Sequence, residues 1–360
     1  MLVKPIPFER KLSSLDHTNQ LNQSPQSSIM HEPLQNRQMK ALQIISAEKA
    51  ETVSLPIPEP GPGCVLVKVT AVTTCPQWDL HIYYGRPMFT HQTHVPFPYP
   101  PGQPGHEMTG TVAKLGEGCQ EFTVGQTVSA WKDPGHMNPG CYAEYVVLEE
   151  KHLIAVPADL HYTQLASLEL AMCVASSILK LKAVAGIAGK TCAVNGLGPA
   201  GLIALQMLAA EGAAQVVGLD PNPRRRATAE QLGLSRSLPS GTDELPLRRT
   251  DGAIEVAVDC VGYPDAVRYL MDHTTEAVAL FAVQRDDYTL HHPGLTVIGY
   301  PGHYREAAEY ALQLIIAGKL QLKPLVSAEM SFEQYAEAVE LLRSQEAIKV
   351  CFVPALSRPN

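Results

Sequence analysis

The spacing of apolar residues divides the chain into a β-rich first half and an alternating second half. Between residues 39 and 160, short apolar runs alternate with polar positions or are interrupted by Pro and Gly, and Cys64–Val72 (CVLVKVTAV) is typical of a strand. Pro96–Gly105 is too rich in Pro and Gly for a helix or a central strand. Further strands are expected at Met39–Ser46, Thr111–Leu115, Gly125–Ala130 and Tyr142–Leu148.

After residue 163 the apolar spacing changes. In Gln164–Ala185 apolar residues recur at intervals of three and four without Gly or Pro, which predicts a helix. Strand and helix patterns then alternate, which indicates a parallel sheet with helices on both faces. We expect strands at Thr191–Val194, Gln215–Leu219, Ile254–Cys260, Thr296–Tyr300 and Lys349–Val353, and helices at Leu202–Glu211, Arg224–Leu232, Arg305–Ala317 and Phe332–Ser344.

The composition is typical of a globular protein, and the chain length favours two domains. Of the 360 residues, 45% are hydrophobic and 18% are charged. The net charge of −8 and the lack of a long Lys/Arg block indicate neither a nucleic-acid partner nor an anionic membrane surface. No apolar run reaches the roughly 18 residues of a membrane span. Residues 1–38 are polar, lack the apolar core of a signal peptide, and are expected to form a disordered extension.

Cysteine usage indicates a reducing environment. Eight cysteines are spread along the chain with no close C-x-x-C pair, which argues against a disulfide framework. The spacing also excludes a compact four-cysteine zinc lobe. We therefore expect a cytoplasmic protein.

A glycine-rich turn follows the strand at Thr191–Val194. Asn195–Leu202 (NGLGPAGL) holds the pattern G-x-G-x-x-G between a strand and an apolar helix, where a dinucleotide-binding turn requires it. The first glycine permits the tight turn, the second lets a pyrophosphate approach the backbone, and the third lets helix and strand pack closely. The N–H groups that begin the helix would bind the phosphates. The predicted cofactor-binding residues here are Gly196, Gly198, Pro199, Ala200 and Gly201.

The next strand ends in an acidic residue, Asp220, about 20 residues after the turn. A carboxylate at this place accepts hydrogen bonds from the adenosine ribose and repels a 2′-phosphate, which favours NAD over NADP. Arg225, within the basic run Arg224–Arg226, weakens this preference because a basic residue just beyond the strand can hold a phosphate. The alternative is a glycine-rich turn that binds no cofactor.

Side chains from three segments are candidates for a metal site. Cys75 follows a strand, His106 and Glu107 follow the proline-rich segment, and Cys173 lies in the helix before the glycine turn. Two thiolates and an imidazole would suit zinc with an open fourth position, and such an ion polarises an alcohol or carbonyl oxygen. Each residue also has a simpler interpretation, because a cysteine in an apolar helix is usually part of the core and a His-Glu pair can cap a turn.

Several segments together resemble the zinc-containing alcohol dehydrogenase-like family of the medium-chain dehydrogenase/reductase superfamily. They are VLVKVTAVTTC (65–75), PGHEMTGTVAKLGEG (104–118), GCYAEYVVL (140–148), GKTCAVNGLGPAGL (189–202) and EAIKVCFVP (346–354). The resemblance covers roughly residues 39–355. It implies an α/β protein with a GroES-like β-barrel catalytic domain, residues 39–175 with 303–360 returning to it, plus a Rossmann doubly wound parallel-sheet domain at 176–302.

The resemblance also implies residue roles. Cys75 and His106 match the first two zinc ligands, and Glu107 matches a neighbouring glutamate that can approach the metal. Asp79 matches the carboxylate that orients the histidine ligand. The remaining matches are His81, in a proton relay, and Lys349, at a cofactor-phosphate contact.

Three departures from the family pattern stand out. Three residues rather than two separate Cys75 from Asp79, so the Ser/Thr hydroxyl that begins the relay is missing or displaced. The third ligand is expected near Met172, and a shift of one residue gives Cys173. Glu169 is the reserve candidate, because it lies one helical turn earlier on the same face and some polyol-type relatives carry a glutamate in this helix. The structural zinc lobe is absent, since segment 116–145 contributes only Cys119 and Cys141.

The leading hypothesis is an NAD-dependent alcohol or polyol dehydrogenase with one catalytic zinc, acting on a small alcohol or carbonyl compound. One alternative is a zinc-free, NADPH-dependent quinone or enoyl reductase of the same fold, which would need neither Cys75 nor His106. Another is a non-catalytic nucleotide-binding protein, because fold alone does not determine activity. The resemblance implies a homodimer or homotetramer joined through the edge strand at Leu295–Tyr300.

Overall fold

The structure is a computed structural model that describes residues 37–88, 94–287 and 290–356. The extension predicted at residues 1–38 lies outside the described residues up to residue 36. The described chain contains two large sheets and a hairpin formed by β1 (Gln38–Ser46) and β2 (Lys49–Pro56). None of the described helices is long and apolar enough to cross a membrane.

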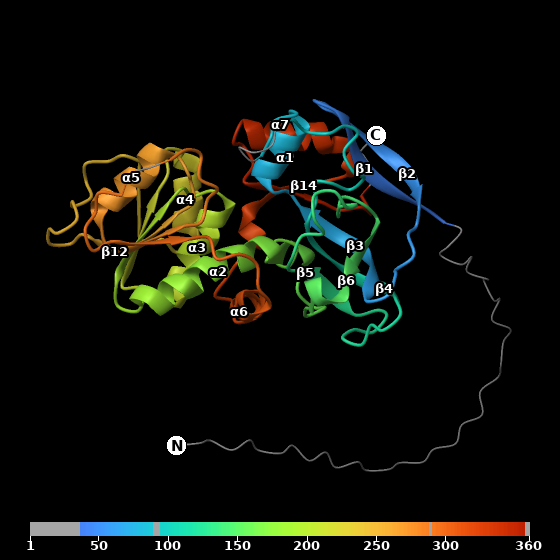
Figure 1. The fold of residues 1–360 in the computed structure, drawn as a ribbon, viewed down its shortest axis with the longest axis horizontal. Helices are drawn as coiled ribbons and strands as arrows, with labels where there is room; N and C mark the ends of the chain where they lie inside the picture. The colour runs from blue at the N-terminus through green and yellow to red at the C-terminus, as the bar shows by residue number, and fades with distance from the viewer. Residues whose placement is uncertain (1–36, 89–93, 288–289, 357–360) are drawn as a thin grey trace, which may run out of the picture. The chain divides into compact units, whose positions relative to one another are not determined.

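The first large sheet has seven strands, of which six lie in one path, in the order β14-β15-β3-β4-β5-β7, and the seventh, β6, pairs with β3. Strands β3 to β7 are antiparallel neighbours, and β15 runs antiparallel to β3, so the end of the chain returns to the sheet that its first half builds (Figure 1). The strands are β3 (Cys64–Thr73), β4 (Glu107–Leu115), β5 (Thr127–Ala130), β6 (Tyr145–Glu149), β7 (Leu153–Ala155), β14 (Val326–Met330) and β15 (Lys349–Phe352).

The second sheet is entirely parallel, in the order β10-β9-β8-β11-β12-β13. The chain runs outward from β8 to β10, then starts again at β11 on the other side of β8, which is the doubly wound arrangement. This confirms the predicted α/β class with a Rossmann-type sheet. The strands are β8 (Thr191–Asn195), β9 (Gln215–Leu219), β10 (Arg236–Leu238), β11 (Ile254–Asp259), β12 (Thr274–Leu280) and β13 (Thr296–Gly299).

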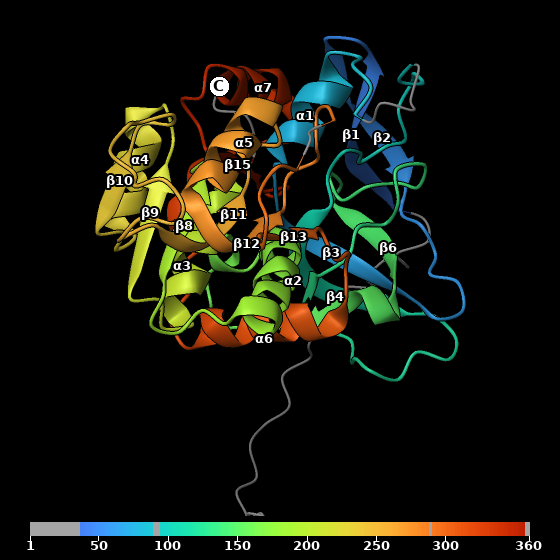
Figure 2. The ribbon, with the colours of Figure 1, turned by 60° about the vertical axis from the view of Figure 1, so that its left-hand side comes forward.

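Helices cover both faces of the parallel sheet. On one face α3 (Pro199–Ala210) packs with α2 (Leu168–Ala185) and α6 (Arg305–Ile316), and Figure 2 shows α2 and α6 side by side. On the other face, α5 (Pro264–His273) packs against β11 and β12, with Val267 and Leu270 buried in the core. The helix α4 (Pro223–Gln231) follows β9. The predicted domain boundary at residues 175 and 176 falls inside α2.

The element predictions are wrong in several places. Strand β4 begins at Glu107 rather than Thr111, and α2 begins at Leu168 because Tyr162–Gln164 forms a separate 3-10 turn capped by His161. The predicted helix at 332–344 is a 3-10 turn followed by α7 (Tyr335–Arg343). The short helix α1 (Pro76–Tyr83), which begins directly after Cys75, was not predicted.

Candidate active site

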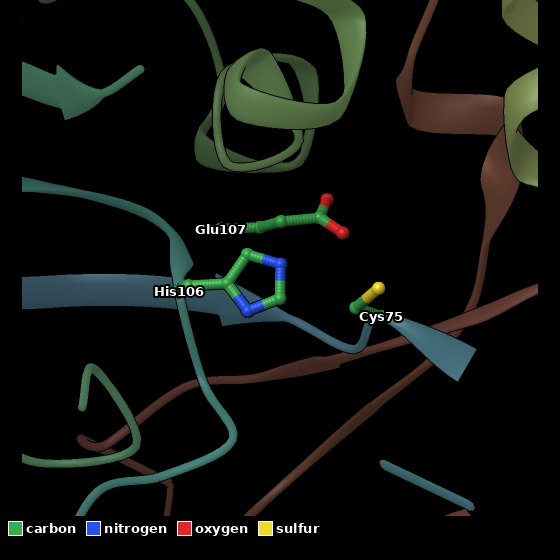
Figure 3. Close-up of side chains that lie close together, drawn as sticks. All are labelled: Cys75, His106 and Glu107. Carbon is green, nitrogen blue, oxygen red and sulfur yellow. The ribbon is translucent and has the colours of Figure 1, made fainter. Parts of the chain in front are cut away.

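The register of β3 and β4 brings Cys75 and His106 together. Thr73, at the end of β3, pairs with Glu107, at the start of β4. Residues just after β3 and just before β4 therefore emerge at the same edge of the sheet. The ligand atoms of Cys75, His106 and Glu107 all lie within 4.8 Å of one another, and Figure 3 shows the three side chains directed toward a common space.

A backbone carbonyl orients His106. Its Nδ1 lies 2.8 Å from the carbonyl oxygen of Pro104, and an N–H at Nδ1 that donates to this oxygen leaves the lone pair of Nε2 for a metal. The sequence predicts this orienting role for Asp79; in this structure the Pro104 carbonyl holds Nδ1, while the Asp79 carboxylate interacts with His106 through its charge. Burial alone would lower the pKa of His106, but the hydrogen bond with Cys75 and the charge of Glu169 raise its pKa well above the ordinary value. The surroundings of the imidazole therefore stabilise positive charge.

Asp79 instead positions the residue that carries the thiol. Its Oδ2 accepts the backbone N–H of Cys75 at 2.8 Å, four residues earlier. The hydroxyls of Tyr142 and Tyr335 donate to its Oδ1 at 2.9 and 2.8 Å. Burial raises the pKa of Asp79 to about 6, although these hydrogen bonds and the charge of His106 lower it. Asp79 thus links the Cys75 segment to helix α7.

Lys349, predicted at a cofactor-phosphate contact, is bonded to protein groups in this structure. The side chain is fully buried in β15, and its Nζ donates to Oε1 of Glu107 at 2.7 Å and to the carbonyl oxygen of Thr74. The second oxygen of Glu107 accepts the hydroxyl of Thr73 at 3.1 Å. Glu107, predicted as a catalytic residue and metal ligand, is therefore held by an ion pair on one side of the cluster.

A second cluster lies next to the first. Glu169 and Cys173 are one turn apart in α2, and His303 lies between β13 and α6, and their ligand atoms are within 4.8 Å of one another. The Sγ of Cys173 donates to Oε1 of Glu169 at 3.3 Å, and Nε2 of His303 lies 3.1 Å from the same oxygen. The other oxygen of Glu169 lies 3.7 Å from Nε2 of His106. The structure thus groups Cys173 with Glu169 and His303, and Glu169 stands between Cys173 and His106.

Sequence reasoning missed His303. No spacing pattern marks this histidine among the 13 in the chain. Its position in the fold could have identified it. Ligands of doubly wound sheets bind beyond the carboxyl ends of the strands, and His303 follows β13, the last strand of the parallel sheet.

His81 lies on α1, outside both clusters. Its Nδ1 is 2.9 Å from the carbonyl oxygen of Pro87. On the same helix, the ring of Trp78 stacks on that of His136 with centroids 4.1 Å apart. An aromatic surface thus stands in the segment where the family pattern has the relay hydroxyl.

The glycines of the turn have different surroundings. Gly196 has φ +88°, and a Cβ on Gly201 would stand 1.7 Å from the carbonyl oxygen of Gly196, so both positions require glycine. Gly198 caps α3 ahead of Pro199, and a Cβ there would meet only the guanidinium of Arg225, at 4.0 Å. The backbone at Gly198 is therefore open to a ligand at the N-terminus of α3, as a pyrophosphate site requires.

Asp220 connects the glycine turn to the end of β9. Its carboxylate accepts the backbone N–H of Leu197 at 2.8 Å and that of Asn222 at 2.8 Å, and the residue is 2% exposed. Arg225 Nη1 lies 3.6 Å from the carboxylate. Asp220, the predicted acceptor of the ribose hydroxyls, and Arg225, the basic residue that could hold a 2′-phosphate, are thus neighbours.

Comparisons with known proteins agree with this architecture. Residues 61–158 match the family model for the alcohol dehydrogenase GroES-like domain, and residues 199–316 match that for zinc-binding dehydrogenases. The (R,R)-butanediol dehydrogenase of Bacillus subtilis (strain 168) is 29% identical over 344 residues, covering 84% of this chain and 94% of that protein. The L-threonine 3-dehydrogenase of Thermococcus kodakarensis is 28% identical over 342 residues, covering 85% and 95%. A zinc-binding dehydrogenase-like protein from Sinorhizobium meliloti 1021, solved with NADP bound, superposes with a TM-score of 0.75 at 22% identity, covering 89% of this chain and 100% of that one.

Proposed function

The chain belongs to the zinc-containing alcohol dehydrogenase-like family of the medium-chain dehydrogenase/reductase superfamily, and we propose that it oxidises a small alcohol or polyol, or reduces the matching carbonyl compound, at the cluster around Cys75 and His106. The observation that carries the proposal is the convergence of a thiol, an oriented imidazole and a carboxylate at one edge of the first sheet. The carboxyl edge of the second sheet provides the place for a nicotinamide dinucleotide.

The residues fit one catalytic zinc ion. Cys75 supplies sulfur, His106 supplies Nε2, and we propose Glu169 rather than Cys173 as the third ligand. With metal–ligand bonds of about 2.0–2.2 Å, two nitrogen or oxygen ligands of a tetrahedral ion lie about 3.4 Å apart. The observed 3.7 Å between His106 Nε2 and Glu169 Oε2 is close to that separation. When bound, the ion polarises the alcohol or carbonyl oxygen.

The side chains around the cluster have positioning roles in this proposal. Asp79 fixes the backbone of Cys75, the Pro104 carbonyl fixes the tautomer of His106, and Lys349 holds Glu107 aside. His81 passes the hydroxyl proton outward, directly or through water, with its Nδ1 retained by Pro87. Trp78 shapes the substrate space where relatives place a hydroxyl.

For the cofactor we propose NAD in preference to NADP. The pyrophosphate would lie on the open backbone of Gly198 at the N-terminus of α3, with Pro199 and Ala200 in the first turn. Asp220 retains lone pairs for the ribose hydroxyls besides the two backbone N–H groups that it accepts. Its negative charge opposes a 2′-phosphate, while Arg225 beside it partly offsets that charge.

We also propose the predicted domain division, a homodimer or homotetramer, and a cytoplasmic location. The return of β14 and β15 to the first sheet supports the division, and the position of β13 at the edge of the parallel sheet supports pairing between two chains. All eight cysteines are free, in keeping with a reducing compartment.

One experiment tests the proposed activity. Protein purified without chelator is assayed for metal and, with NAD or NADP, against secondary alcohols, polyols and cyclitols by the absorbance of the reduced cofactor. We expect bound zinc, and loss of the NAD-dependent activity in Cys75→Ala. The matched control, Cys192→Ala, changes a buried thiol on β8 that lies outside both clusters. Unchanged activity in Cys75→Ala would overturn the proposal in favour of a zinc-free reductase, and inactivity toward every substrate with NAD bound would favour a nucleotide-binding protein.

A further inference from the structure

Glu169 presents its two carboxylate oxygens to different groups of side chains. Oε2 faces His106, which stands beside Cys75. Oε1 faces Cys173 and His303, at 3.3 and 3.1 Å. The proposed catalytic ion uses only the first group.

The second group has the donor set of a zinc-type site. Sulfur, imidazole nitrogen and carboxylate oxygen are the ligands that zinc takes in proteins. For bonds of about 2.0–2.3 Å, ligand atoms around a tetrahedral ion are about 3.3–3.7 Å apart. The separations between Glu169 and its two neighbours, 3.1 and 3.3 Å, need to open only slightly to admit an ion.

This group stands partly on a packed helix and is partly open to solvent. Glu169 and Cys173 are buried on one face of the 18-residue helix α2, which packs along α6. His303 lies in the connection from β13 to α6, two residues before α6 begins, and its side chain is 28% exposed. Two ligands are thus fixed by a helix, while the third lies where an ion can enter.

We propose that Glu169, Cys173 and His303 bind a second divalent cation of the zinc type, with Glu169 bridging it to the ion at Cys75 and His106. The inference goes beyond the proposed dehydrogenase activity, which needs one ion. On binding, the S–H bond of Cys173 breaks, its proton passes to solvent, and a metal–sulfur bond forms without change of oxidation state. The ion ties α2 to the segment that follows β13.

The test is a metal titration of the full chain. Protein freed of metal by a chelator, under reducing conditions, is titrated with Co²⁺ while the thiolate-to-cobalt absorbance and the bound metal per chain are measured. We expect two equivalents, each adding one thiolate to the absorbance. His303→Asn and Cys173→Ser should each lose one equivalent, and Cys75→Ser should lose the other. Cys192→Ser and His152→Asn, at buried positions outside the clusters, should retain two.

The outcomes separate this inference from the proposed function. One equivalent in the natural protein that His303→Asn retains and Cys75→Ser loses would overturn the second site and leave the catalytic proposal standing. One equivalent that Cys75→Ser retains and Cys173→Ser loses would instead overturn the catalytic ligand set. Because His303 is partly exposed, His303→Asn remains decisive if the buried Cys173→Ser does not fold.

Discussion

The Nζ of Lys349 lies 2.7 Å from Oε1 of Glu107, and the two side chains are 0% and 1% exposed. The ion pair joins the start of β4 to β15 across β3, close to Cys75. Removing one partner leaves the other charge buried without compensation, which costs about 3–5 kcal/mol. We therefore expect Lys349→Met to lower the free energy of unfolding by about that amount.

Urea denaturation measures the free energy of unfolding of Lys349→Met and of the double variant that also carries Glu107→Gln. The double variant should recover part of the loss, because no isolated charge remains. Equal instability of single and double variants would show that packing, rather than the unpaired carboxylate, sets the cost.

Asp79 should make the protein less stable as pH rises. Burial raises its pKa from 3.8 to about 6, so the folded state holds the proton more tightly than the unfolded chain. The resulting stabilisation is fully present below pH 4 and is lost as pH rises through about 6. The difference corresponds to about 3 kcal/mol. Between pH 4 and pH 7 we therefore expect the free energy of unfolding of metal-free Asp79→Asn to gain about 2 kcal/mol relative to that of the natural chain. Asp251→Asn, at an exposed position, is the control.

Two glycines of one turn should respond differently to alanine. At Gly201 a methyl group would meet the carbonyl oxygen of Gly196 at 1.7 Å, so Gly201→Ala should destabilise the fold by about 3 kcal/mol. At Gly198 the space is open, so Gly198→Ala should keep the stability but weaken NAD binding about tenfold, or about 1.4 kcal/mol. Thermal unfolding and a fluorescence titration with NAD distinguish the two. An unaltered NAD affinity in Gly198→Ala would contradict the proposal that the pyrophosphate binds at Gly198.

The pair Asp220 and Arg225 should set the choice between the two dinucleotides. In Asp220→Asn the repulsion of a 2′-phosphate disappears and Arg225 loses its acidic neighbour, so the ratio of NADP to NAD affinity should rise about tenfold. Arg225→Ala should weaken NADP binding and leave NAD binding nearly unchanged. Binding titrations of both variants with both cofactors check this, and an unchanged ratio in both would exclude the pair as the determinant.

The sequence predicts best those elements in which apolar residues follow a regular spacing and the ends are marked by turn-forming residues. The predicted bounds of β1, β8 and β9 agree with the structure to within a residue because alternating or continuous apolar runs end at Gly, Asp or Ser. In contrast, β12 begins at Thr274 directly after α5 ends at His273, with no turn residue to mark the change. Helix α1 is eight residues long and begins at a proline, so its apolar pattern is too short to recognise.

The candidate site divides in the same way. The sequence pairs Cys75 with His106 through the family resemblance, and the register of β3 with β4 brings both residues to one edge of the sheet. The family resemblance places Lys349 at a phosphate contact, but its ion pair with Glu107 joins residues 242 positions apart and has no local signal in the sequence. His303 and Glu169 come together only through the packing of α6 on α2, a tertiary relationship without a local signal.

The return of β15 to β3 also fixes the order in which the site can be completed during synthesis. Cys75 and His106 emerge from the ribosome early, but the segment between β3 and Cys75 is held by the last strand. The N–H of Thr74 donates to the carbonyl oxygen of Val350 at 2.9 Å, and the N–H of Val350 donates to the hydroxyl of Thr74 at 2.9 Å. A nascent chain that stops before residue 349 therefore lacks this support for the Cys75 segment, so we expect the metal ligands to acquire their final places only after β15 has been synthesised.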